Sequence, residues 1–313
     1  MTLHPHNELS ERELRIPELM ARVEKLHLRT HRLVNTALAG GYRSSFRGGG
    51  IEFEDVRPYQ PGDEVRRIDW KVTARNGEAY IKSFREERQL SVHFLVDTSR
   101  TMDFGSSQFS KRELAAQFTA LLSLVALRAQ DRVGLTLFGA NPGLHLPCKK
   151  GKNHVLRILR EVLAAKPDRK RSDLKHAIEN HLRAERNRSM VFIVSDFLSD
   201  DDPSTWSDAL ASLNARHDVI AVRVVDPFEE QLPAAGLLRV RELGTDRATE
   251  IDTRSKKVRE VWANDAADRR RALNSALSRA RCDMIEVSTA KDVTGPLMRF
   301  FRRREVRHSG RIA

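Results

Sequence analysis

The sequence predicts an α/β fold with a mostly parallel sheet and helices on both of its faces. From residue 89 onward, short apolar runs typical of buried strands alternate with helical patterns of about 10–20 residues, and this alternation indicates parallel strands joined by crossover helices. Hydrophobic residues make up 40% of the chain and charged residues 31%, as in ordinary globular domains. A chain of 313 residues can bury a core of useful size without disulfides.

Two segments that precede this core have different patterns. In residues 1–40, apolar residues recur at helical spacing up to Gly40 and Gly41, so we expect an amphipathic helix that ends at these glycines. In residues 41–88, two alternating runs flank a Pro-Gly-Asp turn. This pattern predicts a small β-rich segment attached to the core.

Residues 89–300 supply the predicted core, and residues 301–313 follow it as a basic tail. Strands are expected at 89–97, 132–139, 189–198, 218–227 and 282–289, with a short edge strand at 144–148. Helices are expected at 111–130, 154–165, 172–185, 204–217, 255–281 and 291–304. The segment 237–253 predicts a hairpin at a sheet edge.

The formal net charge of +12 is concentrated in two stretches, residues 148–188 and residues 299–313. Such stretches are usually solvated helix faces or frayed tails, and the alternative is a docking surface for an acidic partner. Aromatic residues make up 6% of the chain and are not interleaved with the basic ones. A base-stacking surface is therefore not indicated, and binding of nucleic acid or another anion remains an alternative function.

The sequence also bears on location. The N-terminus is charged from the start, and no apolar stretch is long enough to span a bilayer. The 2 cysteines, Cys148 and Cys282, exclude a disulfide scaffold and a zinc site built from cysteines. We therefore expect a cytoplasmic protein with no transmembrane segment.

Polar residues gather at the predicted strand ends. Asp97, Ser99 and Thr101 follow the first core strand, and a carboxylate with hydroxyls two and four residues later can direct three oxygens to one point. Asp196 ends another strand, and Ser172 begins a helix between them. Oxygen donors of this kind suit Mg²⁺, with Mn²⁺ or Ca²⁺ as alternatives.

These elements resemble a known metal site. Residues 97–101 (Asp-Thr-Ser-Arg-Thr) resemble the D-x-S-x-S element of the metal-ion-dependent adhesion site in von Willebrand factor type A domains. Residues 172–178 resemble the T-N-I-x-x-A-L segment of that fold, and residues 194–197 resemble its T-D-G segment with Phe197 in place of glycine. The resemblance implies a von Willebrand A-like, Rossmann-like sheet. The metal ligands that it implies are Asp97, Ser99, Thr101, Ser172 and Asp196.

A second resemblance covers residues 43–103. The motifs R-x-Y-x-P-G-D (57–63), R-x-I-D-W (66–70) and T-A-R (73–75) resemble those of the bacterial family called domain of unknown function 58 (DUF58). That family is said to combine this signature with a von Willebrand A-like domain and to occur beside MoxR-type AAA+ ATPases. The resemblance implies an adaptor or partner of such an ATPase, or of other von Willebrand A-like proteins, in chaperone-like maturation of protein complexes.

The signature itself has two interpretations. Its charged residues can form a buried ion-pair network that holds the β-rich segment to the core, or its aromatic residues can anchor a contact surface. The residues concerned are Arg57, Tyr59, Asp63, Arg67, Asp69, Trp70 and Arg75.

We expect a non-enzymatic, divalent-metal-dependent protein-interaction module with no catalytic residues. The basic residues Arg169, Lys170 and Arg171 directly precede Ser172, so they are candidates to attract an acidic partner toward the metal. A Mg²⁺-dependent hydrolase is a further alternative, because two carboxylates and a metal can activate water. His176 and His181 are expected on the surface.

Overall fold

The computed structural model describes residues 36–46, 55–60, 68, 70–83, 89–107, 109–140, 142–165, 172–198, 202–241 and 248–309. Its centre is a six-stranded sheet in the order β10-β7-β6-β3-β4-β5. The strands are β3 (Ser91–Asp97), β4 (Arg132–Phe138), β5 (Pro142–Lys149), β6 (Met190–Ser195), β7 (Asp218–Val225) and β10 (Asp283–Ser288). Neighbours pair in parallel except β5, which is antiparallel to β4 at the edge. Read from β5, the chain order is 3-2-1-4-5-6, the Rossmann order, which confirms the predicted fold class.

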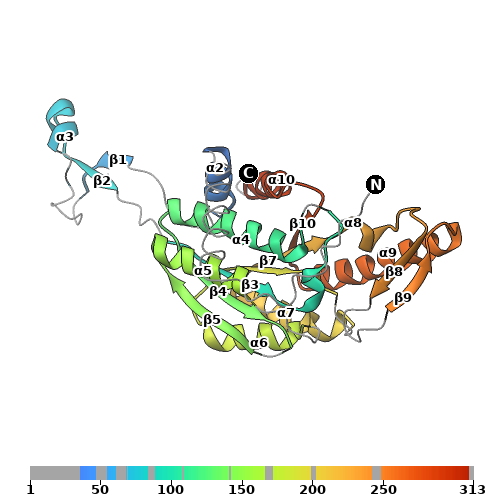
Figure 1. Ribbon diagram of the computed structural model, residues 1–313. Coiled ribbons are helices and arrows are strands. Elements are labelled where there is room, and N and C mark those ends of the chain that lie inside the picture. The colour runs from blue at the N-terminus through green and yellow to red at the C-terminus, as the bar shows by residue number, and fades with distance from the viewer. Residues whose placement is uncertain are drawn as a thin grey trace.

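The central strands are buried and mostly apolar because helices cover both faces of the sheet. Every residue of β6 is buried, and so is every residue of β3 after Ser91. One face packs against α2 (Thr36–Phe46), α4 (Lys111–Arg128), α5 (Lys152–Ala164) and α10 (Thr294–Ser309). The other packs against α6 (Leu174–Ala184), α7 (Ser204–Arg216) and α9 (Lys256–Arg279) (Figure 1).

Helix α2 corrects the prediction of a helix stop at Gly40 and Gly41, because it runs through both glycines to Phe46. A Cβ atom on Gly41 would lie 3.2 Å from Cβ of Phe301, so the glycine lets α2 approach α10 closely. This gain in packing outweighs the poor helix propensity of glycine. The rest of the predicted N-terminal helix, residues 1–35, lies outside the described residues.

The β-rich segment contains β1 (Asp55–Pro58) and β2 (Tyr80–Ser83), which pair antiparallel. Between them lies a helix that the sequence did not predict, α3 (Trp70–Asn76). Figure 1 shows this unit projecting away from the body of the molecule.

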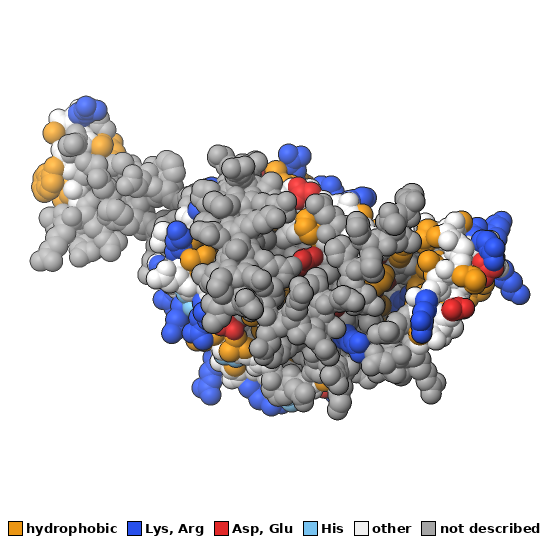
Figure 2. Space-filling model, in the orientation of Figure 1, with side chains coloured by type: hydrophobic (Ala, Val, Ile, Leu, Met, Phe, Trp, Pro, Cys, Tyr) orange, Lys and Arg blue, Asp and Glu red, His pale blue; other side chains and the backbone are white. Residues whose placement is uncertain are grey.

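The predicted hairpin at 237–253 is present as β8 (Leu237–Arg241) and β9 (Ala248–Asp252). It forms a sheet of its own and not an edge of the central sheet, which corrects the predicted location. Two short helical turns were also missed, η2 (Arg100–Asp103) and α8 (Pro227–Glu230). Figure 2 shows lysine and arginine side chains gathered at the end of the molecule formed by β8, β9 and α9. Exposed basic residues there include Arg239, Arg254, Lys256 and Lys257.

The basic residues that follow residue 301 continue a helix, and Arg302, Arg303 and Arg307 are exposed, as expected for a solvated helix face. Helix α10 extends to Ser309, and Phe301 is buried against α2. Arg304 donates two hydrogen bonds to Asp218 (2.9 and 2.6 Å) and one to Asp283 (3.0 Å). Its guanidinium also lies over the rings of Phe46 and Phe300. The helix therefore continues because one of its arginines pairs with carboxylates at the start of β7 and β10.

We expect Arg304→Ala to lower the free energy of unfolding by about 2 kcal/mol, because two partly buried carboxylates lose a charged donor. Arg302→Ala, at an exposed position of the same helix, should change it by less than about 0.5 kcal/mol. Urea unfolding of both variants provides the measurement. Equal stability of the two variants would contradict the structural role of Arg304.

Candidate functional site

Two carboxylates emerge side by side at the carboxyl edge of the sheet. Strands β3 and β6 are parallel neighbours with Val96 opposite Val194, so Asp97 and Asp196 leave the sheet at the same edge. Both are buried, with exposed fractions of 1% and 3%. The main chain after β3 is fixed by Thr98, whose N–H and hydroxyl both donate to the carbonyl of Phe138.

Hydroxyl groups converge on the Asp97 carboxylate. Its Oδ1 accepts from the N–H of Ser99 (2.8 Å), and its Oδ2 accepts from the hydroxyls of Ser172 (3.0 Å) and Ser195 (2.6 Å). The Ser99 and Thr101 hydroxyls are 2.9 Å apart within the turn that η2 forms. The four predicted residues Asp97, Ser99, Thr101 and Ser172 are thus brought together. Ser195 was missed, and the signal that could have found it is a hydroxyl directly before the Asp196 carboxylate.

The surroundings of the Asp97 carboxyl disfavour its ionised form. Burial, and next the nearby charge of Asp196, raise its pKa to about 6, although the hydrogen bonds from Ser195 and Ser99 act in the opposite direction. Among the described residues, no ion pair joins Asp97 to a lysine or arginine. A buried carboxylate without a compensating cation is a feature of functional sites.

A buried lysine forms an ion pair with Asp196. Lys111, the first residue of α4, is fully buried, and its Nζ donates to Asp196 Oδ2 (2.6 Å) and to Glu229 Oε1 (2.5 Å). Burial opposes the charge of the ammonium, but the two carboxylates outweigh it and raise the pKa of Lys111. The other Asp196 oxygen accepts from the N–H of Leu198 (2.9 Å). Both oxygens of Asp196 are therefore engaged.

Sequence reasoning missed this lysine, although one signal was present. A cation in the first turn of a helix is disfavoured by the helix dipole, and Lys111 begins α4 directly after the Ser110 cap, which forms a capping box with Glu113. This signal is weak, because Lys256 also follows a serine cap and has an exposed side chain.

Phe197 occupies the place where the resembled motif has glycine, and its backbone keeps a glycine-like conformation. Its φ is 56°, in the left-handed region that costs a bulky residue about 1 kcal/mol or more. The side chain packs near Trp206, with ring centroids 6.2 Å apart. The turn after Asp196 is thus held in a strained conformation, as expected beside a functional site.

The oxygen donors fit a hard divalent cation. Asp97, Ser99, Thr101 and Ser172 offer one carboxylate and three hydroxyls around one point. Asp196 differs from the predicted direct ligand, because Lys111 and Leu198 take its oxygens. It is suited to act through a water molecule, since Mg²⁺ usually keeps several waters.

The other predicted site residues are placed as follows. Arg169, Lys170 and Arg171 lie outside the described residues, as do Asp63, Arg67, Asp69 and the side chain of Arg57. Tyr59 is half-buried, Trp70 is 68% exposed and Arg75 is exposed. The exposure of Arg75 contradicts its assignment to a buried ion-pair network, because its charge is solvated. His181 corrects the surface assignment, because its exposed fraction is 1%.

Comparisons with known proteins give the following similarities. The family model described as "Protein of unknown function DUF58" matches residues 55–272. The uncharacterized protein Rv1480 of Mycobacterium tuberculosis strain H37Rv is 31% identical over 288 residues, which cover 91% of this chain and 89% of that protein. The uncharacterized protein YeaD of Bacillus subtilis is 30% identical over 113 residues, or 36% of this chain and 26% of that protein.

Among solved structures, BatB from Bacteroides thetaiotaomicron is 14% identical, with 69% of this chain and 98% of that chain covered and a TM-score of 0.45. The SpRpn10 VWA domain is 11% identical, with coverage of 67% and 93% and a TM-score of 0.36. Within the described part of the chain, no helix has the length and apolar character needed to span a membrane.

Proposed function

This chain belongs to the DUF58 family, and from that premise we propose that it is a non-enzymatic protein-interaction module that depends on a divalent metal. The observation that carries the proposal is the convergence of three hydroxyl-bearing residues on a buried Asp97 carboxylate that lacks a cation. Mg²⁺ bound there would keep open positions. A carboxylate of a partner protein would fill one of them.

The partner we propose is a MoxR-type AAA+ ATPase or another von Willebrand A-like protein, acting in maturation of protein complexes. Its support is the family resemblance of the signature in residues 57–75. A location in the cytoplasm stays a prediction. Asp97, Ser99, Thr101 and Ser172 are the proposed direct ligands, and Asp196 acts through water while Lys111 holds it.

Asp97→Asn should abolish Mg²⁺ binding yet stabilise the metal-free protein at pH 7 by about 1–2 kcal/mol. Because the pKa of Asp97 is raised, the folded state takes up a proton before the unfolded state does as the pH falls. The ionised carboxylate therefore lowers stability fully above about pH 6, and this cost disappears below about pH 4. The gain from the substitution should therefore vanish at low pH. Urea unfolding with and without Mg²⁺ measures both effects.

Asp265→Asn is the matched control, because Asp265 is exposed on α9. It should leave Mg²⁺ binding and stability unchanged at both pH values. Stabilisation of the Asp97→Asn protein by Mg²⁺ equal to that of the wild type would overturn the metal site.

Partner binding is best tested at constant Mg²⁺, since an AAA+ ATPase itself needs Mg²⁺ with its nucleotide. Immobilised wild-type, Asp97→Asn and Asp265→Asn chains are incubated with a purified MoxR-type ATPase from the same organism. We expect retention by the wild type and the control, and loss with Asp97→Asn. Equal retention of the ATPase by all three chains would contradict the metal-bridged mechanism. Retention of a DNA duplex with a steep salt dependence would favour the nucleic-acid alternative.

A further inference from the structure

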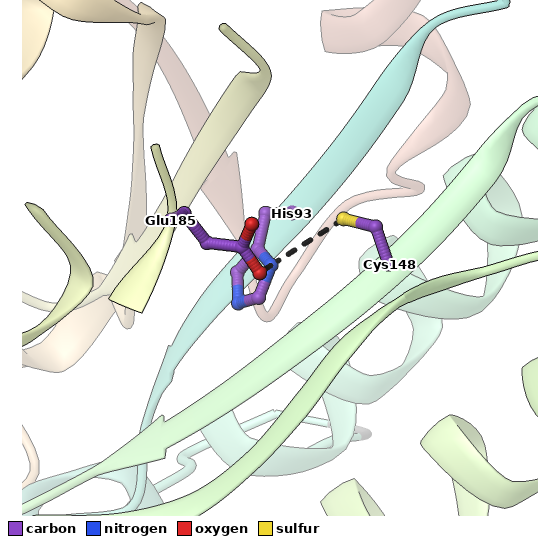
Figure 3. A group of neighbouring side chains, drawn as sticks. All are labelled: His93, Cys148 and Glu185. Carbon is purple, nitrogen blue, oxygen red and sulfur yellow. Dashed lines mark hydrogen bonds and ion pairs between the residues drawn. The ribbon is translucent and has the colours of Figure 1, made fainter. Parts of the chain in front are cut away.

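A second cluster of side chains that can bind a metal lies toward the amino ends of the parallel strands, away from the Asp97 site. His93 precedes Asp97 by four positions on β3, which separates the two by about 13 Å along the strand. Cys148 lies near the end of the antiparallel edge strand β5, and Glu185 caps the end of α6. The ligand atoms of these three residues all lie within 4.8 Å of one another. Figure 3 shows the three side chains pointing toward a common centre.

The distances in this cluster approach those of a metal site. The Cys148 sulfur is 3.6 Å from Nδ1 of His93, and a Glu185 oxygen is 4.0 Å from the same nitrogen. For tetrahedral zinc with ordinary Zn–S and Zn–N lengths, the corresponding separations are about 3.6 Å and about 3.4 Å. To bind the same metal ion as His93, the Glu185 carboxylate would need to move toward that ring by about half an ångström.

Gly134 keeps the centre of the cluster open. A Cβ atom at this position of β4 would lie 2.5 Å from His93 Nδ1 and 2.8 Å from the Cys148 sulfur. Any side chain there would thus fill the space beside both donor atoms.

The His93 ring is oriented by a hydroxyl that it shares with His145. Oγ1 of Thr136 lies 2.8 Å from His93 Nε2 and 2.9 Å from His145 Nδ1. This hydroxyl leaves the other nitrogen of each ring facing Glu185, with His145 Nε2 3.7 Å from the Glu185 oxygen. Such outer contacts fix the tautomer and orientation of histidine ligands.

Hydrogen bonding in and around the cluster is incomplete. Within the described part of the chain, both ring nitrogens of the buried His181 have no hydrogen-bond partner, and that ring lies 4.5 Å from the His93 ring. The Cys148 thiol donates to the carbonyl of Val92 at 3.6 Å, and the 4.0 Å contact of His93 with Glu185 is too long for a hydrogen bond. Partly satisfied buried polar clusters are costly, and a bound cation would compensate them.

We propose that His93, Cys148 and Glu185 bind a zinc ion, with a water molecule as the fourth ligand. One imidazole nitrogen, one thiolate and one carboxylate form a mixed donor set that suits Zn²⁺. The scarcity of cysteines excludes an all-cysteine site but not this one, which needs a single thiolate. Binding transfers the Cys148 proton to solvent. The ion would fasten the end of α6 to β3 and β5, while the start of the same helix adjoins Ser172 of the Asp97 site.

The test measures metal binding by the full chain after removal of metals with a chelator. Zn²⁺ affinity is determined by competition with a chromophoric chelator, and Co²⁺ is added separately as a spectroscopic probe of thiolate ligation. The variants are Cys148→Ser and Glu185→Gln. Cys282→Ser is the matched control, because Cys282 lies outside the cluster and donates to the carbonyl of Val219. Asp97→Asn separates this site from the one proposed above.

We expect one Zn²⁺ per wild-type chain and a thiolate-to-cobalt charge-transfer band. Cys148→Ser should lose the band and weaken Zn²⁺ binding at least about 100-fold, more than the 10–100-fold cost of losing an outer-shell partner. Glu185→Gln, with a smaller change at the half-buried helix end, should weaken binding with the fold intact. Cys282→Ser and Asp97→Asn should bind as the wild type does. Zn²⁺ affinity unchanged in Cys148→Ser and Glu185→Gln, or lost in Asp97→Asn, would overturn the proposal.

Discussion

Replacing Lys111 with methionine is expected to lower the free energy of unfolding by about 3–5 kcal/mol. The substitution keeps an unbranched side chain that is one atom shorter, and it removes the ammonium that pairs with Asp196 and Glu229. Both carboxylates, together with Asp97, would then share a buried region without a cation. Loss of one partner from a buried ion pair leaves an uncompensated charge, and this accounts for the size of the effect. Urea unfolding without metal measures it.

Mg²⁺ should restore part of this loss. Without Lys111, the Asp196 Oδ2 oxygen becomes free to bind a metal directly, and the added carboxylate charge favours a divalent cation. A ligand that binds only the folded state stabilises it in proportion to its affinity. We therefore expect Mg²⁺ to raise the unfolding midpoint of Lys111→Met by more than that of the wild type.

Lys256→Met is the control, because Lys256 also begins a helix directly after a serine cap. Its side chain is 82% exposed and pairs with the exposed Glu260, so the substitution should cost less than about 1 kcal/mol. Adding Asp196→Asn to Lys111→Met should recover more than half of the lost stability, since one of the unpaired charges is removed. A loss below about 1 kcal/mol for Lys111→Met would show that the pair contributes little.

The central sheet could be predicted from the sequence because its signals are local. The buried strands are continuous apolar runs, and the amphipathic helices between them have caps and helical spacing. The continuation of α2 through Gly40 and Gly41 could not be predicted, because it depends on contact between Gly41 and Phe301. Arg304 is a similar case, since its carboxylate partners lie on β7 and β10. Long-range packing overrides local propensity at these positions.

The candidate site likewise contains residues that the sequence could predict and residues that it could not. Asp97, Ser99 and Thr101 are close in the sequence, and their spacing predicts a shared oxygen site once Ser172 and Asp196 are added at another helix start and strand end. The ion pair of Lys111 could not be predicted, because no residue near Lys111 in the sequence points to Asp196, which lies 85 positions later. The histidine cluster was missed for a related reason. His93, His145 and His181 come from different elements, and only the sheet order brings their rings together.

Acidification is expected to destabilise the metal-free protein through its buried histidines, and His181 should contribute about 3 kcal/mol between about pH 6.5 and pH 4. Burial, and next the nearby His217 and His145, lower the pKa of His181 to about 3. An unfolded histidine binds its proton near pH 6.5. Between these values the unfolded state holds more protons than the folded state, so stability falls as the pH falls.

Asp97 acts with the opposite sign, because its raised pKa lets the folded state take up a proton first as the pH falls below about 6. The two effects overlap in pH, so the histidine contribution must be isolated by substitution. His181→Leu removes the titrating ring together with its unpartnered nitrogens. This variant should match or exceed the wild type in stability at about pH 7.5, and it should lose about 2–3 kcal/mol less on acidification to about pH 4.5.

His176→Leu is the control on the same helix, at a position that is only half-buried, and its stability should follow the wild-type pH dependence. Urea unfolding of the three proteins in the presence of a chelator, at several pH values from about 7.5 to 4.5, provides the comparison. Parallel stability curves for the wild type and His181→Leu would mean that this ring accepts a proton in the folded state. In that case the buried histidines do not set the acid limit of the fold. A curve that flattens only in His181→Leu assigns that limit to a ring packed between His93 and His217.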